Sequence, residues 1–132
     1  MKDKKWVVDS RCSRHISGEK QIFTKIDPFD GGHIKFGNNA TGKVVGIGEI
    51  GKDFKFDHML LVKGLKHNLL SVSQICDNGC RVTFDSTNCI VTKVEDNSTI
   101  LVGQRVDNIY IIDLESPTNV NFSCLASFDD DS

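Results

Sequence analysis

Short runs in which hydrophobic and polar residues alternate make up most of this chain, and turn residues separate them. Residues 33–36, His-Ile-Lys-Phe, alternate polar and apolar side chains, and residues 43–50 resume as a second strand with glycines inside it. Between them lies the turn-forming segment 37–42, Gly-Asn-Asn-Ala-Thr-Gly. Two strand patterns joined by such a turn predict a β-hairpin.

A longer strand is predicted over residues 52–62. Phe54 and Phe56 fall on one of its faces, because successive side chains of a strand point to opposite faces. Residues 59–62, Met-Leu-Leu-Val, are apolar without interruption. This part of the strand is therefore expected to be buried on both faces.

The second half of the chain predicts a meander of short strands, which is typical of small barrels and sheets. The expected strands are 81–84, 89–94, 99–102 and 109–112, and the turns between them are 85–88, 95–98 and 107–108. The fold class predicted from these patterns is mainly β.

One segment, residues 68–79, has a helical period instead. Asn68 stands at its start, Gly79 closes it, and the apolar residues between them group on one side of a helix. Asn is a preferred helix cap and Gly a preferred helix terminator. The segment predicts one short helix near residues 68–78.

Composition and charge limit the classes of partner. A chain of 132 residues corresponds to one domain. The net charge of −2 and the isoelectric point near 6.0 indicate no basic surface for nucleic acid. No apolar run has the length that spans a bilayer, and no signal peptide is visible at the start of the chain. We expect no nucleic-acid or membrane partner, and a cytoplasmic location.

Three parts of the chain are expected from these patterns. Residues 1–5 are an N-terminal extension, residues 6–115 form the β-domain, and residues 116–132 are a polar tail. The tail contains Pro117 and has Asp at positions 129–131, so it is expected to be poorly ordered.

The cysteines and histidines give only weak signs of a metal site. The five cysteines are Cys12, Cys76, Cys80, Cys89 and Cys124, and the four histidines are His15, His33, His58 and His67. An odd number of cysteines at irregular spacing fits reduced thiols in a cytosolic protein. Single Cys-x-x-His and Cys-x-x-x-Cys spacings occur, at Cys12 and at Cys76, and a zinc-binding adaptor stays open as an alternative. We expect no metal and no cofactor, and the histidines are expected at the surface or in loops.

The segment from Trp6 to Gly18 carries the candidate chemistry. The apolar pair Val7-Val8 runs directly into Asp9-Ser10, so a buried strand ends and an acid emerges at its tip. An aspartic protease presents its catalytic carboxylate in this way. The alternative is that an Asp-Ser pair after a strand is only a turn. Trp6 is expected to anchor the core at the start of the strand.

Three stretches together resemble one family. Trp6–Ser10 with Cys12–Gly18 resembles a WxxDSGCSxHxTG opening, residues 36–39 through Gly46–Gly48 a glycine-rich flap, and Leu61–Val72 the segment LVxGLxxNLLSVSQL. The chain thus resembles the protease segment of a copia-type retrotransposon polyprotein, a retropepsin-like aspartic protease. Residues 109–113 with 124–126 resemble the lead-in to the pre-integrase region, so residues 89–115 would be a terminal meander leading to it.

The resemblance implies a fold and a set of site residues. The fold would be a small closed retropepsin-like β-barrel with one short helix. Asp9 would be catalytic, with Ser10, Arg11 and Cys12 as the active-site loop. The flap would be Phe36, Gly37, Asn38, Asn39, Ala40, Thr41 and Gly42, and the structural helix segment would be Leu69, Leu70 and Ser71. The function implied is processing of a Gag-Pol polyprotein, in the context of a virus-like particle.

Peptide hydrolysis by this chemistry needs two close carboxylates that share one proton. The chain offers one suitable acid, Asp9, because Asp85 lies in a turn without a following glycine and Asp113 leads into the polar tail. A homodimer would supply the second carboxylate from its other copy. The expected partners are therefore a second copy of the chain and a polyprotein peptide, which would bind as an added strand.

Arg11 departs from the family pattern, which has Gly at this position. A residue other than Gly is strained there if the position requires a positive φ. A guanidinium that reaches the carboxylates favours the fully ionised pair over the pair that shares a proton. We expect impaired proteolysis, and the alternative is a catalytically degenerate β-domain that acts as a peptide-binding or structural module.

Overall fold

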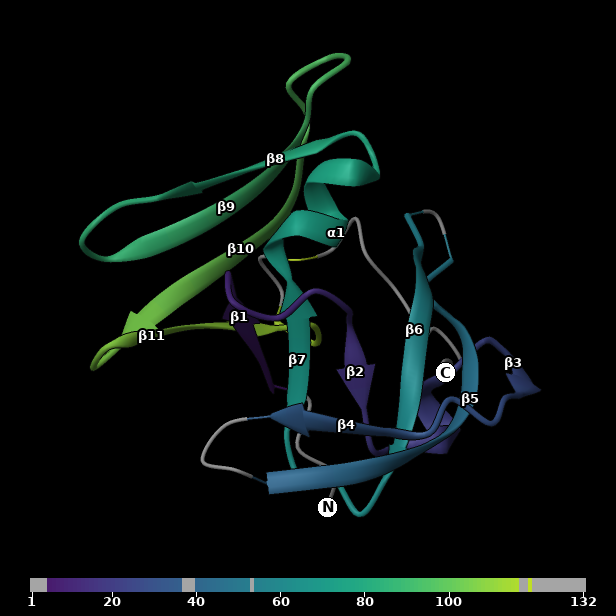
Figure 1. The fold of residues 1–132 in the computed structure, drawn as a ribbon. Coiled ribbons are helices and arrows are strands. Elements are labelled where there is room, and N and C mark those ends of the chain that lie inside the picture. The colour runs from purple at the N-terminus through teal and green to yellow at the C-terminus, as the bar shows by residue number, and fades with distance from the viewer. Residues whose placement is uncertain (1–4, 37–39, 53, 117–118, 120–132) are drawn as a thin grey trace.

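The computed structural model describes residues 5–36, 40–52, 54–116 and 119 (Figure 1). Its elements follow one another as β1 (Lys5–Asp9), β2 (Ile16–Ser17), the 3₁₀ turn η1 (Lys20–Ile22), β3 (Lys25–Pro28), β4 (His33–Phe36), β5 (Ala40–Ile50), β6 (Phe56–Lys63), β7 (Asn68–Ser71), α1 (Val72–Asp77), β8 (Cys80–Phe84), β9 (Asn88–Lys93), β10 (Thr99–Val106) and β11 (Ile109–Asp113). The predicted mainly β fold with one short helix is confirmed.

The strands of the described residues form one continuous sheet. Its order is β3-β5-β6-β2-β7-β1-β11-β10-β9-β8, and β4 pairs with β5 beside this path. Figure 1 shows β8, β9 and β10 on one side of the molecule, β3 to β6 on the other, and β1, β2 and β7 between them. The central position of β1 follows from its two neighbours, β7 in parallel and β11 antiparallel.

The expected closure of the sheet into a barrel needs a correction. Within the described residues the path is open, because its end strands β3 and β8 do not pair with each other. β3 pairs along β5 alone, and it ends at Pro28, which lacks the N–H that a second neighbour would need. The two sides of the sheet share a core instead, because one buried cluster contains Phe56 and Met59 of β6 and Val91 of β9.

The helix begins later than predicted. Asn68 does not cap it, because residues 68–71 form β7 and pair in parallel with β1. The helix α1 covers residues 72–77, and its cap is Ser71, whose hydroxyl accepts a hydrogen bond from Gln74 N–H. Gly79 follows the helix with a φ of +83°, as the closing glycine predicted. Pairing with β1 outweighs the local preference of the segment for a helix.

Two apolar clusters make up the core. The larger one surrounds Trp6, Leu70 and Ile75 and joins β1, β7 and α1 to the β9–β11 strands. The smaller one lies around Ile16, Val44 and Val62. Trp6 is 1% exposed, so its predicted role as a core anchor is confirmed. The apolar run at residues 59–62 is buried throughout, also as predicted.

Asn119 packs back onto the sheet. Its Oδ1 accepts a hydrogen bond from Val102 N–H at 2.7 Å, and its Nδ2 donates to the carbonyls of Val102 at 3.2 Å and Asp113 at 2.7 Å. The Asn119 side chain thereby pairs with the backbone N–H and carbonyl of Val102, beyond the point where β10 stops pairing with β11. The polar composition of the expected tail did not predict this contact. Most of that tail, residues 117–118 and 120–132, lies outside the described residues.

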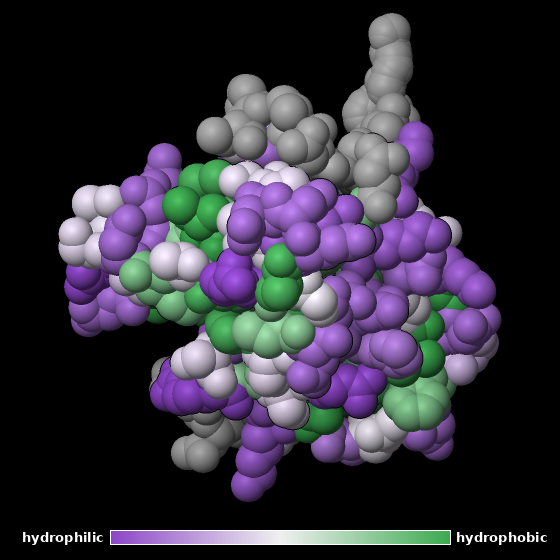
Figure 2. Space-filling model, turned by 90° about the horizontal axis from the view of Figure 1, so that it is seen from above, coloured by the Kyte–Doolittle hydropathy of each residue, from purple (hydrophilic) through white to green (hydrophobic). Residues whose placement is uncertain are grey.

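The face of the molecule seen from above is mainly polar. Hydrophilic side chains cover most of its coloured part, and hydrophobic ones form small separate patches (Figure 2). Within the described part of the chain, no helix has the length and apolar character needed to cross a membrane.

Candidate functional site

Asp9 is the last residue of the central strand β1. It lies beside Ser71 of β7 in the parallel pairing, and its predecessor Val8 lies opposite Tyr110 of β11. The side chain of Asp9 is 23% exposed, whereas Trp6 and Val8 of the same strand are buried. The carboxylate therefore emerges at the tip of a buried strand, as the sequence predicted.

Arg11 forms a tight turn with this carboxylate. The Arg11 N–H donates to Asp9 Oδ1 at 2.8 Å, and the guanidinium Nε lies 3.6 Å from the same oxygen. The guanidinium is 89% exposed, so the ion pair contributes little to folding stability. The guanidinium nevertheless places a permanent positive charge beside the Asp9 carboxylate.

The strain expected from Arg11 is not found. The non-glycine residues with positive φ in the described structure are His58, Asn97 and Asp107, so the backbone of Arg11 does not occupy the left-handed region. The chain accommodates a side chain at this position without a backbone penalty. Any effect of Arg11 on chemistry must therefore come from its charge and its bulk.

A cleft of about 430 Å³ opens beside Asp9. One wall is the end of β1 with the Ser10–Arg11 turn, and the other contains Phe84, Ile109 and Tyr110. The rings of Phe84 and Tyr110 meet edge to face with centroids 4.8 Å apart. The Tyr110 hydroxyl donates to the Asp85 carbonyl at 2.6 Å, which fixes the ring at the rim of the cleft.

Sequence reasoning missed this apolar wall. Phe84 is 41% exposed and Ile109 is 44% exposed, although both come from strands whose inner residues are buried. Alternation along a strand shows which residues share a face, but it does not show that a strand end stands beside Asp9. The only available signal was the clustering of large apolar residues at strand ends.

His15 lies in a loop, as expected, but it is buried there and is not a surface histidine. It is 2% exposed and meets Phe56 edge to face with centroids 5.2 Å apart. Its Nδ1 accepts a hydrogen bond from Ser71 N–H at 2.9 Å. Burial lowers the pKa of His15 to about 3, the Asp57 carboxylate opposes this shift, and Arg14 adds to it. His15 is therefore a neutral core residue.

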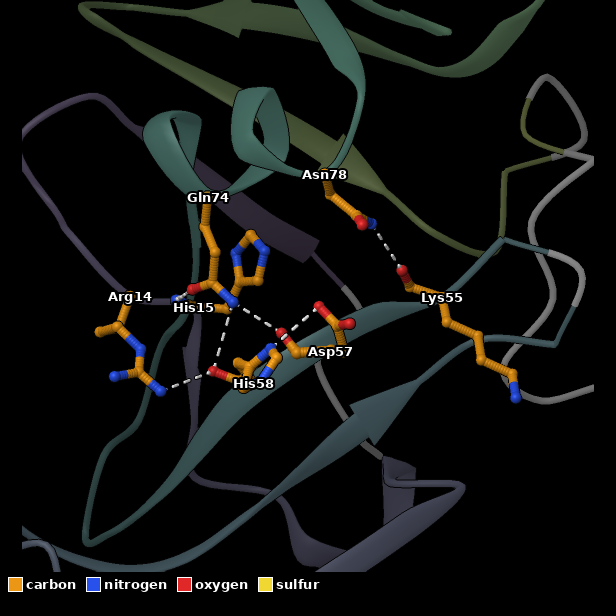
Figure 3. A network of polar contacts seen from close by, with 7 residues as sticks. All are labelled: Arg14, His15, Lys55, Asp57, His58, Gln74 and Asn78. Atoms are coloured by element: carbon orange, nitrogen blue, oxygen red, sulfur yellow. Dashed lines mark hydrogen bonds and ion pairs between the residues drawn. The ribbon is translucent and has the colours of Figure 1, made fainter.

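Gln74 of α1 joins this histidine to the strand β6 (Figure 3). Its Oε1 accepts from His15 N–H at 2.9 Å, and its Nε2 donates to the carbonyls of Asp57 at 2.6 Å and His58 at 3.3 Å. Arg14 donates to the same His58 carbonyl at 3.3 Å. The backbone at His58 is left-handed, with φ of +54°, which turns its carbonyl toward these donors.

The proposed flap coincides with the β4–β5 hairpin. Phe36 pairs with Ala40, Lys35 with Thr41 and Ile34 with Gly42, so the predicted hairpin is confirmed. Its turn, residues 37–39, lies outside the described residues. The segment Leu69, Leu70 and Ser71, expected in a helix, is strand β7 and its junction with α1.

The candidate zinc groups do not assemble in the structure. The described residues contain no group of three or more His, Cys, Asp or Glu side chains placed to hold a metal ion. The Cys12 thiol lies 3.3 Å from the Arg14 carbonyl, burial raises its pKa, and Nδ1 of His15 is already occupied by Ser71. Cys76 is exposed and Cys80 is buried.

Comparisons with known proteins agree on one relationship. The model of the family described as "Pol polyprotein, beta-barrel domain" matches residues 6–80. The chain is also 28% identical over 97 residues to the retrovirus-related Pol polyprotein from transposon TNT 1-94 of Nicotiana tabacum. That alignment covers 69% of this chain and 7% of the polyprotein, so the chain spans a small part of this relative. No solved structure matches the chain significantly.

Proposed function

This chain belongs to the family of Pol polyprotein β-barrel domains, and on that premise we propose that it is the aspartic endopeptidase segment of a retrotransposon Gag-Pol polyprotein. The observation that carries the proposal is the position of Asp9. Its carboxylate stands at the tip of a buried central strand and opens into a cleft with an apolar wall. The activity proposed is impaired by Arg11.

The mechanism requires a symmetric dimer. Asp9 of one copy would face Asp9 of the other, and the pair would share one proton. The ionised member activates a water molecule, and the protonated member donates a hydrogen bond to the peptide carbonyl. Exposed apolar side chains beside Asp9, those of Phe84 and Ile109, support a binding surface at this end of the sheet. The occupants proposed for it are the second copy and an extended peptide.

The β4–β5 hairpin is the proposed flap. The strand registers place the Phe36–Ala40 end of this hairpin beyond the Trp6 end of β1, whereas Asp9 stands at the opposite end of that strand. The hairpin would therefore have to move toward Asp9 before its closure could exclude water from a peptide bound as an added strand. The residues proposed for this role are the flap residues 36–42, of which the structure describes the strand pairing at Phe36–Ala40, Lys35–Thr41 and Ile34–Gly42.

The charge of Arg11 supports the proposed impairment. The guanidinium Nε lies 3.6 Å from Asp9 Oδ1, so a permanent positive charge on a long side chain stands beside the candidate carboxylate. Two such side chains would meet near the two-fold axis of the proposed dimer, and their repulsion would disturb the pairing of the two carboxylates. The same contact favours the second candidate function, a β-domain without turnover that binds a peptide or serves as a structural module.

Two variants separate the charge of Arg11 from its bulk. Arg11→Ala removes the guanidinium but keeps a Cβ, whereas Arg11→Gly restores the residue of the family pattern. Cleavage of an unstructured peptide library is measured for the parent chain, both variants, and the double variant Arg11→Gly/Asp9→Asn. We expect Arg11→Gly to cleave faster than the parent chain by a factor of about 100, the scale on which a misplaced catalytic group lowers a rate.

The controls decide between the two candidate functions. Loss of all cleavage in the double variant assigns the chemistry to Asp9. Sedimentation of each variant at the assay concentration reports whether a dimer is present. A dimeric Arg11→Gly protein that cleaves nothing would contradict the protease proposal and leave the peptide-binding module.

A further inference from the structure

The loop that carries the Ser10–Arg11 turn begins at Asp9 and ends at His15. Inside this loop, the hydrogen bonds of the described residues are mostly local: Arg11 N–H to Asp9 Oδ1, and the Cys12 thiol to the Arg14 carbonyl. Arg14 reaches the His58 carbonyl only through its exposed side chain. The far end of the loop is therefore held to the rest of the protein mainly through His15.

His15 makes three hydrogen bonds to three different elements. Its Nδ1 accepts from Ser71 N–H at the start of α1, its N–H donates to Gln74 Oε1 on α1, and its carbonyl accepts from Leu60 N–H on β6. Each of these bonds is 2.9 Å long. One buried residue thus fixes the loop against α1 and β6 through its backbone, and against Ser71 at the end of β7 through its side chain.

The bond from Ser71 determines the tautomer of the imidazole. An Nδ1 that accepts a hydrogen bond carries no proton, so the proton of the neutral ring lies on Nε2. Ser71 is fully buried, and its N–H would lose its partner if the imidazole were protonated at Nδ1. Ser71 is also the residue that lies beside Asp9 across the β1–β7 pairing.

We propose that His15 is a positioning residue for Asp9. Its neutral imidazole accepts the hydrogen bond from the N–H of Ser71, the residue beside Asp9, and its backbone holds the far end of the loop that begins at Asp9. This inference rests on the proposed protease function for its catalytic meaning, but the geometric part stands on the contacts of His15 alone. His15 does not touch the cleft and acts through Ser71 and the loop.

The electrostatic environment supports this role. Burial lowers the pKa of His15 to about 3, with Asp57 opposing and Arg14 adding to the shift. A pair of carboxylates that shares one proton works in mildly acidic solution. The imidazole therefore remains a neutral acceptor under the conditions in which Asp9 would work.

Three variants test the proposal. His15→Asn places Oδ1 where Nδ1 of the imidazole stood, so it keeps an acceptor for Ser71 N–H. His15→Leu keeps an apolar side chain but has no acceptor. Val91→Ala removes a fully buried side chain from β9, away from the loop, and serves as the control for a general loss of stability.

The first readout is independent of catalysis. Amide hydrogen exchange and amide chemical shifts of Arg11 and Ser71 are measured by NMR in each protein. In His15→Leu we expect both amides to exchange faster by about tenfold, the scale of one lost hydrogen bond, and the Arg11 resonance to move. His15→Asn retains most of the protection, and Val91→Ala leaves the Arg11 resonance in place.

The second readout uses the Arg11→Gly background. There His15→Leu is expected to lower kcat by about 100-fold with little change in KM, as misplacement of a catalytic group does, and His15→Asn restores most of kcat. If His15→Leu fails to fold, His15→Met replaces it, because Met is a flexible apolar side chain that fits irregular space and offers Ser71 N–H no comparable acceptor.

The outcomes separate the two claims. An Arg11 amide that is unchanged in His15→Leu, while Ser71 N–H alone becomes exposed, would overturn the positioning role. Absence of cleavage in every protein, with the Arg11 amide moving as expected, would refute the protease function and leave the positioning of the Asp9 loop intact.

Discussion

Ser71 lies directly beside Asp9 in the parallel pairing of β7 and β1. The same residue ends β7, caps α1 through its hydroxyl, and donates its N–H to His15. Three structural tasks therefore meet at the immediate neighbour of the candidate catalytic carboxylate. A change at Ser71 affects the strand, the helix and the loop together.

Loss of the helix cap is the first expected consequence. Ser71→Ala removes the acceptor for Gln74 N–H, and a lost N-cap costs about 1 kcal/mol of folding free energy. Urea unfolding measures this cost. Ser86→Ala is the control, because Ser86 is exposed in the turn between β8 and β9, whereas the Ser73 hydroxyl lies 3.1 Å from the capping hydroxyl of Ser71. Equal stability of the two variants would show that the cap contributes nothing.

Gly18 is expected to tolerate no side chain. A Cβ at this position would lie 2.1 Å from the Leu65 carbonyl oxygen, so the backbone would have to move. Overpacking of this kind costs about 1–3 kcal/mol, and Gly18→Ala should lower the urea midpoint accordingly. Gly64→Asn is the matched control, because nothing lies within 4 Å of a Cβ there and Asn accepts its left-handed backbone. An unchanged midpoint for Gly18→Ala would contradict the close approach.

The free energy of unfolding should decrease as the solution is acidified. His15 has a folded pKa of about 3, below its ordinary value of 6.5. As the pH falls, the unfolded chain therefore binds this proton before the folded protein does. The contribution of His15 to the free energy of unfolding is fully present above pH 6.5 and is lost as the pH falls toward 3. The slope approaches about 1.4 kcal/mol per pH unit inside this window.

His15→Asn isolates this contribution. Urea unfolding of the parent chain and the variant is compared at several pH values between 6.5 and 4. The carboxylates of Asp85 and Asp96 have pKa values lowered by their hydrogen bonds, so they also lose stability near the acid end of this range, and this effect is common to both proteins and cancels in the comparison. Parallel pH profiles for the two proteins would mean that His15 titrates normally.

Thiol reactivity should divide the cysteines by burial. Burial raises the pKa of Cys89 to about 11 and also raises that of Cys80, so both are poor nucleophiles. Cys76 is exposed on α1 and is expected to react first with a thiol reagent. Mass spectrometry of the Cys124→Ser variant after brief labelling locates the label. Early modification of Cys89 would indicate local opening of β9 and β10.

Self-association should depend on the apolar wall of the cleft. Phe84→Ser removes an exposed aromatic ring beside Asp9. If the dimer uses this end of the sheet, its dissociation constant is expected to increase. Phe29→Ser is the matched control, because Phe29 is 43% exposed and does not line this cleft. Sedimentation equilibrium compares the two. A larger effect of Phe29→Ser would move the interface elsewhere.

The sequence predicted what short-range periodicity encodes. The hairpin at residues 33–50, the buried run at 59–62 and the meander after Gly79 follow from alternation and turn residues, and the structure has each of them. The partly exposed carboxylate of Asp9 after two apolar residues belongs to the same class of signal.

Long-range pairing explains what the sequence did not reveal. Asn68 begins a helical pattern, yet β1 draws residues 68–71 into the sheet from the other end of the chain. His15 stands among polar residues, and its burial depends on Ser71 and Gln74, which lie 56 and 59 positions away. The wall formed by Phe84 and Tyr110 likewise needs β8 and β11 to meet the end of β1.

The antiparallel pairing of β1 and β11 has a mechanical consequence. Lys5 lies opposite Asp113, so the chain enters β1 and leaves β11 at the same end of this strand pair, away from Asp9. A force applied between segments attached there would break the residue pairs of the two strands one after another, starting at Lys5 and Asp113. It would not load all of the pairs at once in shear. Asp9 follows Val8, whose pair with Tyr110 would open last, so a pull on the flanking chain would reach the carboxylate only after the strand pair had separated.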